Sequence, residues 1–351
     1  MNISEQTSLR QRLKAIQVEL IDSLGSELSE PVTPALGRLV HLLDWIRLEQ
    51  FVDEGCGVGR PPRARFAIAN AFIAKAVLRL PTTVALIDRL KVDRALRRIC
   101  GFAWYQQLPN ESTFSRAFDE FAKQRLAERV HEALIKEQLG QQLIGHLSRD
   151  STAIPAREKP KRQAVDRPSA DKASPKVSIK PSRGRPRKGE VRPPPAPTRL
   201  ARQRQQHVAA MLAELPQACS RGAKCNAQGY KTAWNGYKLH LDTADCGVPI
   251  SAVLTSADVH DSQVAIPLSR LSAQRVTNLY DVMDAAYCSA ELREDSRSLG
   301  HIPLIDHNAR GGSKQEFAPH EAQRYQERTV AERMNARLKD EFGGNHVWVR
   351  T

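Results

Sequence analysis

The chain has 351 residues, of which 41% are hydrophobic, and its 53 Lys and Arg residues outnumber its 39 Asp and Glu residues to give a net charge of +14. This length allows two domains with a substantial buried core. No apolar run is long enough to cross a membrane, and the charged N-terminus lacks the apolar centre of a secretory signal, so a cytoplasmic protein is expected. The six cysteines include no CxxC pair, which argues against a zinc site and favours reduced thiols.

Residues 1–140 are predicted to form a helical N-terminal domain for DNA binding or assembly. Apolar side chains recur there at the three- and four-residue spacing of amphipathic helices. The spacing is found in three stripes, Leu36–Ile46, Ala69–Leu80 and Leu126–Leu134. Pro81 is expected to end the second helix, because proline cannot continue one.

A turn at residues 108–110 precedes a capped helix start within this region. One interpretation is a helix-turn-helix that presents Ser115 and Arg116 to DNA. Because such patterns are loose, a plain helical bundle is the favoured interpretation.

Residues 141–155 are predicted to be the first strand of a second domain, and residues 156–205 a solvated basic insertion after it. The insertion carries 16 Lys and Arg against four Asp and Glu, with nine prolines and no aromatic residue. Its isolated apolar side chains cannot bury enough surface to offset the entropy of ordering it, so disorder is expected.

Within the insertion, residues 183–190 read RGRPRKGE. The Arg-Gly-Arg-Pro core resembles the AT-hook, a short extended peptide that enters the minor groove of A·T-rich DNA. The groove concentrates negative potential, and the glycine and proline keep the backbone slim. DNA contact is therefore expected for Arg183, Arg185, Arg187 and Lys188; an ordinary solvated charge run is the alternative.

Residues 206–351 are predicted to complete an α/β domain with a mixed sheet. Strands are expected at residues 145–154, 234–243, 248–255, 278–284 and 301–306, with the second and third forming a hairpin around Cys246-Gly247. Helices are expected at about residues 262–273, 289–299 and 323–342. The order of three strands followed by alternating helices and strands favours a mixed sheet.

The final helix carries the most specific pattern. Tyr325, Arg328, Glu332 and Lys339 are spaced so that they share one side of a helix, while Val330, Ala331, Met334 and Leu338 occupy the other. A surface salt bridge would explain Arg328 and Glu332 but not the Tyr and Lys in the same stripe.

The spacing Tyr-x2-Arg-x3-Glu-x6-Lys resembles the signature of one large branch of DDE transposases from bacterial insertion sequences. The segments Trp234–His240, Ala257–Ser262, Cys100–Phe102 and Pro109–Phe114 resemble the same family. The resemblance implies an RNase H-like core with an Asp-Asp-Glu triad. The triad matches Asp150 on the first strand, Asp284 after the fourth strand and Glu332 on the last helix, although Ala286 stands where the family more often has Gly.

The resemblance also implies the chemistry and the partners. The three carboxylates would bind two Mg²⁺ ions, or Mn²⁺ in their place, for metal-dependent cleavage and strand transfer. The DNA partners would be the terminal inverted repeats of the element and the target, bound by a homodimer. Tyr325, Arg328 and Lys339 would contact the DNA near the cut.

Other functions remain open from the sequence alone. The chain could be a non-catalytic DNA-binding protein derived from a decayed transposase. A tyrosine recombinase is a weaker alternative, because Tyr325 and Tyr287 lack the expected Arg and His surroundings. A metal phosphohydrolase would use His260 and Asp261, but no second His cluster accompanies them.

Two further expectations concern individual residues. Asp281 precedes Asp284 by three positions on a strand, so it should point to the opposite side and matter little to catalysis. The chain stops 19 residues after Glu332, which suggests a C-terminal truncation. Such a truncation would leave Val330, Met334, Leu338 and residues 347–349 partly uncovered.

Overall fold

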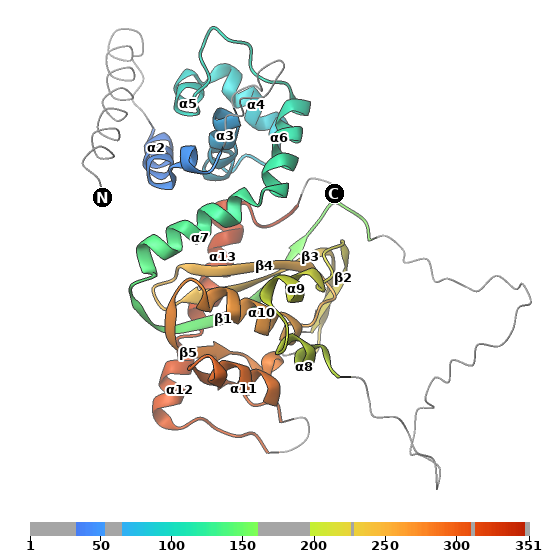
Figure 1. Cartoon of the computed structure of the whole chain (residues 1–351). Coiled ribbons are helices and arrows are strands. Elements are labelled where there is room, and N and C mark those ends of the chain that lie inside the picture. The colour runs from blue at the N-terminus through green and yellow to red at the C-terminus, as the bar shows by residue number, and fades with distance from the viewer. Residues whose placement is uncertain (1–32, 53–64, 161–196, 226–227, 310–312, 348–351) are drawn as a thin grey trace, which may run out of the picture. The chain divides into compact units, whose positions relative to one another are not determined.

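A computed structural model describes residues 33–52, 65–160, 197–225, 228–309 and 313–347 (Figure 1). The chain divides into two compact units, Met1–Ala127 and Glu128–Thr351. The boundary lies inside helix α7 (Leu126–Leu139), upstream of the position 140 expected from the sequence. Most of α7 belongs to the second unit because Ile135 packs in one cluster with Leu147 of the sheet.

The first unit is helical throughout its described part. Its helices are α2 (Pro34–Ile46), α3 (Arg65–Val77), α4 (Thr83–Val92), α5 (Arg94–Ile99) and α6 (Glu111–Lys123), with a short 3₁₀ helix at Leu48–Gln50. Fully buried apolar side chains from five helices form its core, among them Leu39, Ile68, Leu86, Leu96 and Phe114. Helix α3 ends three residues before the expected Leu80, whose N–H bonds the carbonyl of Lys75.

The length of the loop before α6 decides between the two interpretations of this unit, a plain helical bundle and a helix-turn-helix. Asn110 caps α6 as expected, since its side chain accepts a 3.0 Å hydrogen bond from the N–H of Thr113. The preceding helix ends at Ile99, so residues 100–110 lie between the two helices. A helix-turn-helix joins its helices by a turn of about 3–4 residues. The bundle interpretation is therefore the one that fits this unit.

The second unit is built on a six-stranded mixed sheet. Its strands are β1 (Leu143–Pro155), β2 (Ser220–Cys225), β3 (Lys231–Ala244), β4 (Pro249–Ser256), β5 (Thr277–Met283) and β6 (Ile302–Ile305). The order is β2-β3-β1-β5-β6, and β4 pairs with β3. Strand β1 runs antiparallel to β3 and parallel to β5, and β6 is parallel to β5. The mixed α/β fold expected from the sequence is thus confirmed, and it is consistent with an RNase H-like core.

Helices cover both faces of this sheet (Figure 1). Arg149 of β1 bonds Asp242 of β3, which also accepts a 2.7 Å hydrogen bond from Ser272 of α10 (Ser262–Ala273). Asp150, the next residue, must point to the opposite face, because side chains alternate along a strand. There its carboxylate accepts a hydrogen bond from Asn335 of α13 (Thr329–Phe342). Helix α11 (Ala290–Ser298) packs beside α10.

The edges of the predicted basic insertion belong to the folded core. Residues 199–203 form α8, and Gln203 is fully buried with its side-chain amide 2.8 Å from the carbonyl of Gln263. Helix α9 (Val208–Ala213) follows, and neither helix was expected. Residues 161–196 lie outside the described part of the chain, and the AT-hook-like residues 183–188 are among them.

The C-terminal segment is two helices rather than the single one predicted. Helix α12 (Pro319–Gln326) ends before α13 begins at Thr329. Between them, successive N–H groups bond carbonyls three residues back, which tightens the chain at Glu327 and Arg328. None of the described helices has the length and hydropathy that a membrane crossing requires.

The apolar side of α13 is covered, contrary to the exposed patch expected from the sequence. Val330 and Met334 are buried, and Leu338 is half-buried. Val347 pairs with β1, where its N–H donates to the carbonyl of Pro155 at 2.9 Å. Helix α13 packs on β1 and β3, so the sheet buries this side of the helix. Residues 348 and 349 of the expected patch lie outside the described part of the chain.

Candidate active site

Two of the three predicted triad carboxylates lie on neighbouring parallel strands, Asp150 within β1 and Asp284 directly after β5. The register of β1 and β5 pairs Ser148 with Val282 and Arg149 with Met283. Asp150 and Asp284 are the next residues along each strand, and both are half-buried. Asp284 follows β5 and caps a short 3₁₀ helix (Ala285–Tyr287), accepting a 3.0 Å hydrogen bond from the N–H of Ala286. The fold thus brings together residues that are far apart in the sequence.

Burial and like charge act together on these carboxylates. Burial raises the pKa of Asp150, and the negative charge of Asp284 raises it further. Burial also raises the pKa of Asp284, with a contribution from the charge of Asp261. Arg328 and Lys224 oppose both shifts without cancelling them. The site therefore concentrates negative charge in a partly dehydrated place, which is typical of a functional centre.

Asn335 connects α13 to the first carboxylate. Its side-chain N–H donates to Asp150 Oδ2 at 2.9 Å, and the residue is only 7% exposed. Its Oδ1 is buried and has no hydrogen-bond partner among the described residues. Asn335 is three residues after Glu332, so it lies on the same side of the helix. The sequence analysis missed it because an Asn within a helix has many ordinary explanations.

Glu332 lies in the first turn of α13, where its carboxylate forms an ion pair with Arg328. Its Oε1 accepts a 2.6 Å hydrogen bond from Arg328, and its side chain is 53% exposed. Within the described ranges, no three His, Cys, Asp or Glu side chains are close enough to hold a metal ion. The structure therefore brings Asp150 and Asp284 together and leaves Glu332 bound to Arg328.

The remaining members of the stripe lie near the same carboxylates. Burial lowers the pKa of Lys339, and its surroundings include the charges of Lys224 and Asp150. Burial raises the pKa of Tyr325, which also lies near Asp284 and stacks on Phe317 with ring centroids 4.9 Å apart. Arg328 belongs to the junction between α12 and α13, so the stripe follows a bent path rather than one straight helix.

Asp261 and Lys224 were not predicted for this site. Asp261 was considered for a metal phosphohydrolase, yet its charge acts on Asp284 while Lys238 donates to it at 3.0 Å. Lys224 is exposed on β2, a strand that the sequence pattern did not show. In the sequence, both residues lie in polar segments next to strands. Such positions are too common in proteins to identify a functional residue.

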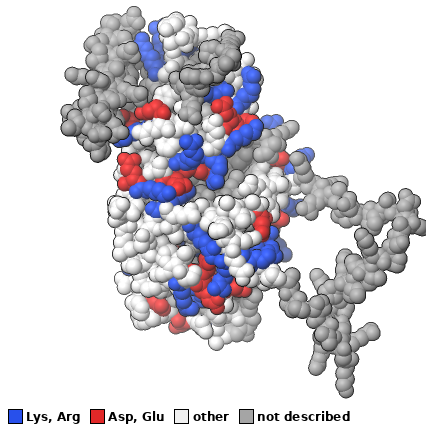
Figure 2. Space-filling model, viewed as in Figure 1, with Lys and Arg blue, Asp and Glu red and all other residues white. Residues whose placement is uncertain are grey.

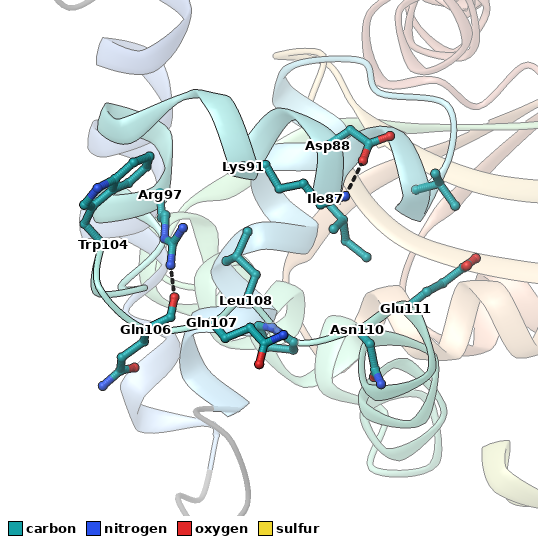
Figure 3. Close-up of a pocket in the computed structure, with 12 residues that line it drawn as sticks. Ile87, Asp88, Lys91, Arg97, Trp104, Gln106, Gln107, Leu108, Asn110 and Glu111 are labelled. Carbon is teal, nitrogen blue, oxygen red and sulfur yellow. Dashed lines mark hydrogen bonds and ion pairs between the residues drawn. The ribbon is translucent and has the colours of Figure 1, made fainter.

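A cavity of about 590 Å³ lies elsewhere, in the helical unit (Figure 3). It is lined by α4, α5 and the loop before α6, with Trp104 at one side. Three of its charged side chains are used within the unit, since Lys91 bonds Asp88 and Arg97 bonds the carbonyls of Ala103 and Gln106. No residue of the carboxylate site lines this cavity.

The charges of the described surface are mixed. In Figure 2, Lys and Arg side chains are interspersed with Asp and Glu side chains over the visible face. This agrees with the sequence, in which the excess positive charge is concentrated within residues 156–205.

Comparison with known families identifies the fold that carries this site. A family model described as a transposase DDE domain matches residues 146–351, which is more than half of the chain. The chain belongs to the DDE transposases of insertion sequences. A second model, described as a transposase domain (DUF772), matches residues 27–120 in the helical unit. No curated protein and no solved structure matches the chain significantly.

Membership of the family supports a coarse description of the activity. DDE transposases are enzymes of the polynucleotidyl-transferase type that act on DNA and depend on divalent metal ions. The resemblance drawn from Tyr325, Arg328, Glu332 and Lys339 is confirmed at the level of the family, while the match to one branch stays a prediction.

Proposed function

We propose that this transposase cleaves the ends of its own element and joins them to target DNA, with Asp150, Asp284 and Glu332 as its catalytic carboxylates. The observation that carries the proposal is the register of β1 and β5, in which Asp150 and Asp284 are the residues directly after the paired Arg149 and Met283. A homodimer bound to the terminal inverted repeats is the proposed working form.

The oxygen ligands of the site fit a hard divalent cation such as Mg²⁺. Asp150 and Asp284 are half-buried like charges, and a cation between them would offset their repulsion. Asp150, Asp284 and Glu332 would hold the metal. When bound, a pair of such ions activates the attacking oxygen and stabilises the leaving oxygen of a phosphodiester.

The side chains around the carboxylates position the DNA strand. Arg328 and Lys339 supply positive charge for the phosphates next to the cut, and Tyr325 packs beside Arg328, whose guanidinium lies 6.0 Å from the ring centroid. A phosphate that binds Arg328 competes with Glu332 for the same guanidinium. DNA binding would then release the Glu332 carboxylate for catalysis.

The basic segment supplies further contacts with DNA. Arg183, Arg185, Arg187 and Lys188 are proposed to bind the phosphate backbone or the minor groove, on the basis of their sequence. Replacing all four by Ala should weaken DNA binding and reduce its salt dependence, by about 0.9 in the log–log slope for each phosphate that the protein no longer neutralises.

The test is strand cleavage of a plasmid that carries the DNA flanking this reading frame, measured with and without Mg²⁺. Cleavage should require the metal and should fall by about 1,000-fold or more, about 4 kcal/mol, in Asp150→Asn, Asp284→Asn and Glu332→Gln. DNA binding measured in Ca²⁺ should be retained by all three. The matched control is Asp119→Asn, an exposed carboxylate of α6 that pairs with Lys123.

Wild-type cleavage by any of the three variants would remove that residue from the catalytic set. A wild-type protein that binds the flanking DNA but never cuts it would instead support the non-catalytic alternative.

A further inference from the structure

Helix α5 of the helical unit carries two arginines that form no ion pair within the described ranges. Residues 88–98, which end with this helix's basic stretch, contain five Lys and Arg but only two Asp. Both carboxylates already form ion pairs with cations of α4. Arg94 and Arg97 of α5 therefore keep their positive charge without a described carboxylate beside them.

The two guanidinium groups lie against the same aromatic ring. The guanidinium carbon of Arg94 is 4.5 Å from the centroid of the Trp104 ring, and that of Arg97 is 4.9 Å from it. The face of a Trp ring attracts a cation, but it supplies only a small part of what a full negative charge would. The ring thus holds two like charges near each other, and an anion bound beside them would offset their repulsion.

Arg97 is buried at one side of the cavity of the helical unit (Figure 3). It is 7% exposed, and its Nη2 donates to the carbonyl of Ala103 at 2.9 Å and to the carbonyl of Gln106. Its Nε is buried and has no hydrogen-bond partner among the described residues. Burial lowers the pKa of Arg97, yet an arginine stays charged in a protein. A buried cation with an unused donor, lining a cavity, is suited to an anionic ligand.

The acidic side chains of the cavity do not neutralise this corner. Asp88 pairs with Lys91, and Glu111 lies on the other side of the cavity from Trp104 in Figure 3. Arg94 is exposed, Trp104 is 40% exposed and the neighbouring Tyr105 is 87% exposed. Arginines beside exposed aromatic rings are typical of nucleic-acid surfaces, where guanidinium groups bind phosphates and rings pack on sugars or bases.

We propose that Arg94 and Arg97, held against Trp104, bind a phosphate of the DNA backbone, which makes α5 and the loop after it a DNA-binding surface of the helical unit. The inference rests on the proposed function only in taking DNA as the partner, and it requires no cleavage. A phosphate contact of this kind fixes the position of the DNA without reading its sequence.

The test compares Arg94→Ala with Arg116→Ala on α6. Both arginines are exposed and neither forms an ion pair with a described residue, so each variant loses one similar charge. Arg116 is also the residue that the helix-turn-helix interpretation presents to DNA. The probe is a fluorescent duplex of the DNA that flanks the reading frame, titrated in Ca²⁺ at several salt concentrations. Arg94→Ala should lower the log–log salt slope by about 0.9 and weaken binding about 3- to 10-fold, and Arg116→Ala should change both less.

Two further measurements examine the nature of the contact. Because a phosphate carries no sequence information, Arg94→Ala should weaken binding to a duplex of shuffled sequence by the same factor. Trp104→Ala changes no charge, but it should also weaken duplex binding, by about 3-fold, because the ring orders both guanidinium groups. Arg94→Ala should unfold at the wild-type temperature, since its side chain is exposed.

Equal losses in Arg94→Ala and Arg116→Ala would overturn the assignment, because net charge alone would then explain the binding. A larger loss in Arg116→Ala would favour the surface of α6 instead. If Arg94→Ala removes calorimetric binding of inorganic phosphate but leaves duplex binding unchanged, the corner takes a small anion and the DNA surface is wrong. Absent cleavage by a wild type that binds the duplex through Arg94 would contradict the proposed chemistry and leave this inference standing.

Discussion

Two neighbouring residues of β1 lie in opposite electrostatic environments. Arg149 is 3% exposed and donates two hydrogen bonds to Asp242, at 2.7 and 2.8 Å. Burial alone would lower the pKa of Arg149, but the charge and hydrogen bonds of Asp242 outweigh it and the pKa is raised. Asp150 points to the other face, where burial and the charge of another carboxylate, Asp284, raise its pKa.

The contrast between Arg149 and Asp150 distinguishes charges that stabilise the fold from charges that are proposed to take part in catalysis. On the α10 face Arg149 and Asp242 form an ion pair, and the bond from Ser272 to Asp242 joins α10 to the central strands. On the α13 face the like charges of Asp150 and Asp284 remain adjacent, which costs stability and is retained where a ligand or a reaction requires it. The predictions below test this contrast.

The largest effect on folding is expected from Asp242→Ala. The substitution leaves the Arg149 guanidinium buried without its carboxylate, which costs about 3–5 kcal/mol of unfolding free energy. Urea unfolding measures the loss. Asp150→Asn provides the comparison, since it removes one of two like charges and should leave stability equal or higher. Similar destabilisation by both substitutions would mean that the two faces do not differ in the way described.

Asn335→Leu should affect chemistry rather than folding. The substitution removes the hydrogen bond to Asp150 but also removes a buried Oδ1 that has no partner in the described structure. Residues that orient a ligand carboxylate typically contribute about 10- to 100-fold to activity or metal affinity. We expect a loss of cleavage in that range, a higher Mg²⁺ requirement and little change in Tm. A large fall in Tm would make Asn335 a structural residue.

Asp281→Asn should destabilise the protein in a pH-dependent way, whereas its small effect on catalysis stays a prediction from the sequence. Asp281 is 1% exposed and accepts hydrogen bonds from Ser296 at 2.6 Å and His301 at 3.1 Å. Burial alone would raise its pKa, but these bonds and the charge of Arg149 lower the pKa below its ordinary 3.8. It does lie on the face opposite Asp150, as the strand pattern predicted.

Because its folded pKa is lowered, Asp281 stabilises the fold above the unfolded value of 3.8, and this contribution is lost as pH falls through the folded pKa. The wild type should be more stable than Asp281→Asn by about 1–3 kcal/mol at neutral pH. Unfolding measured from pH 7 to pH 2 should show this gap narrowing below pH 3.8. A gap that widens in acid would contradict the assignment.

The parts of the fold that the sequence predicted are those with strong local patterns. Strands β1, β3, β4 and β5 and helix α10 have regular apolar spacing, and Gly247 marks the turn of the β3–β4 hairpin with φ of 83°. Strand β2 reads SRGAKC and has no apolar alternation, because it belongs to an exposed ribbon. The break at Glu327 and Arg328 was invisible because the helical pattern continues through it.

Only those site residues that belong to the family's spaced motifs could be predicted from the sequence. Asp150 and Asp284 were found from the family resemblance, and the structure places them directly after the paired residues Arg149 and Met283 of adjacent strands. Lys224 was missed because β2 has no apolar alternation, and Asp261 was missed because it lies in the turn before α10. Neither position leaves a periodic signal in the sequence.

The smallest effect on folding is expected at Glu332, the carboxylate that the structure leaves outside the pair. Glu332 and Arg328 form an i,i+4 ion pair with the glutamate side chain 53% exposed. Such pairs contribute about 0.3–0.5 kcal/mol, because water screens the charges and two long side chains must be ordered. Glu332→Gln should therefore lower the unfolding free energy by no more than that amount.

The matched control is Glu341→Gln on the same helix, which removes a comparable i,i+4 pair with Arg337. Both variants should unfold at nearly the same urea concentration, and only Glu332→Gln should lose cleavage. A stability loss several-fold larger for Glu332→Gln would indicate that its pair with Arg328 is structural, and the contrast between the two faces of the sheet would then stop at Asp150 and Asp284.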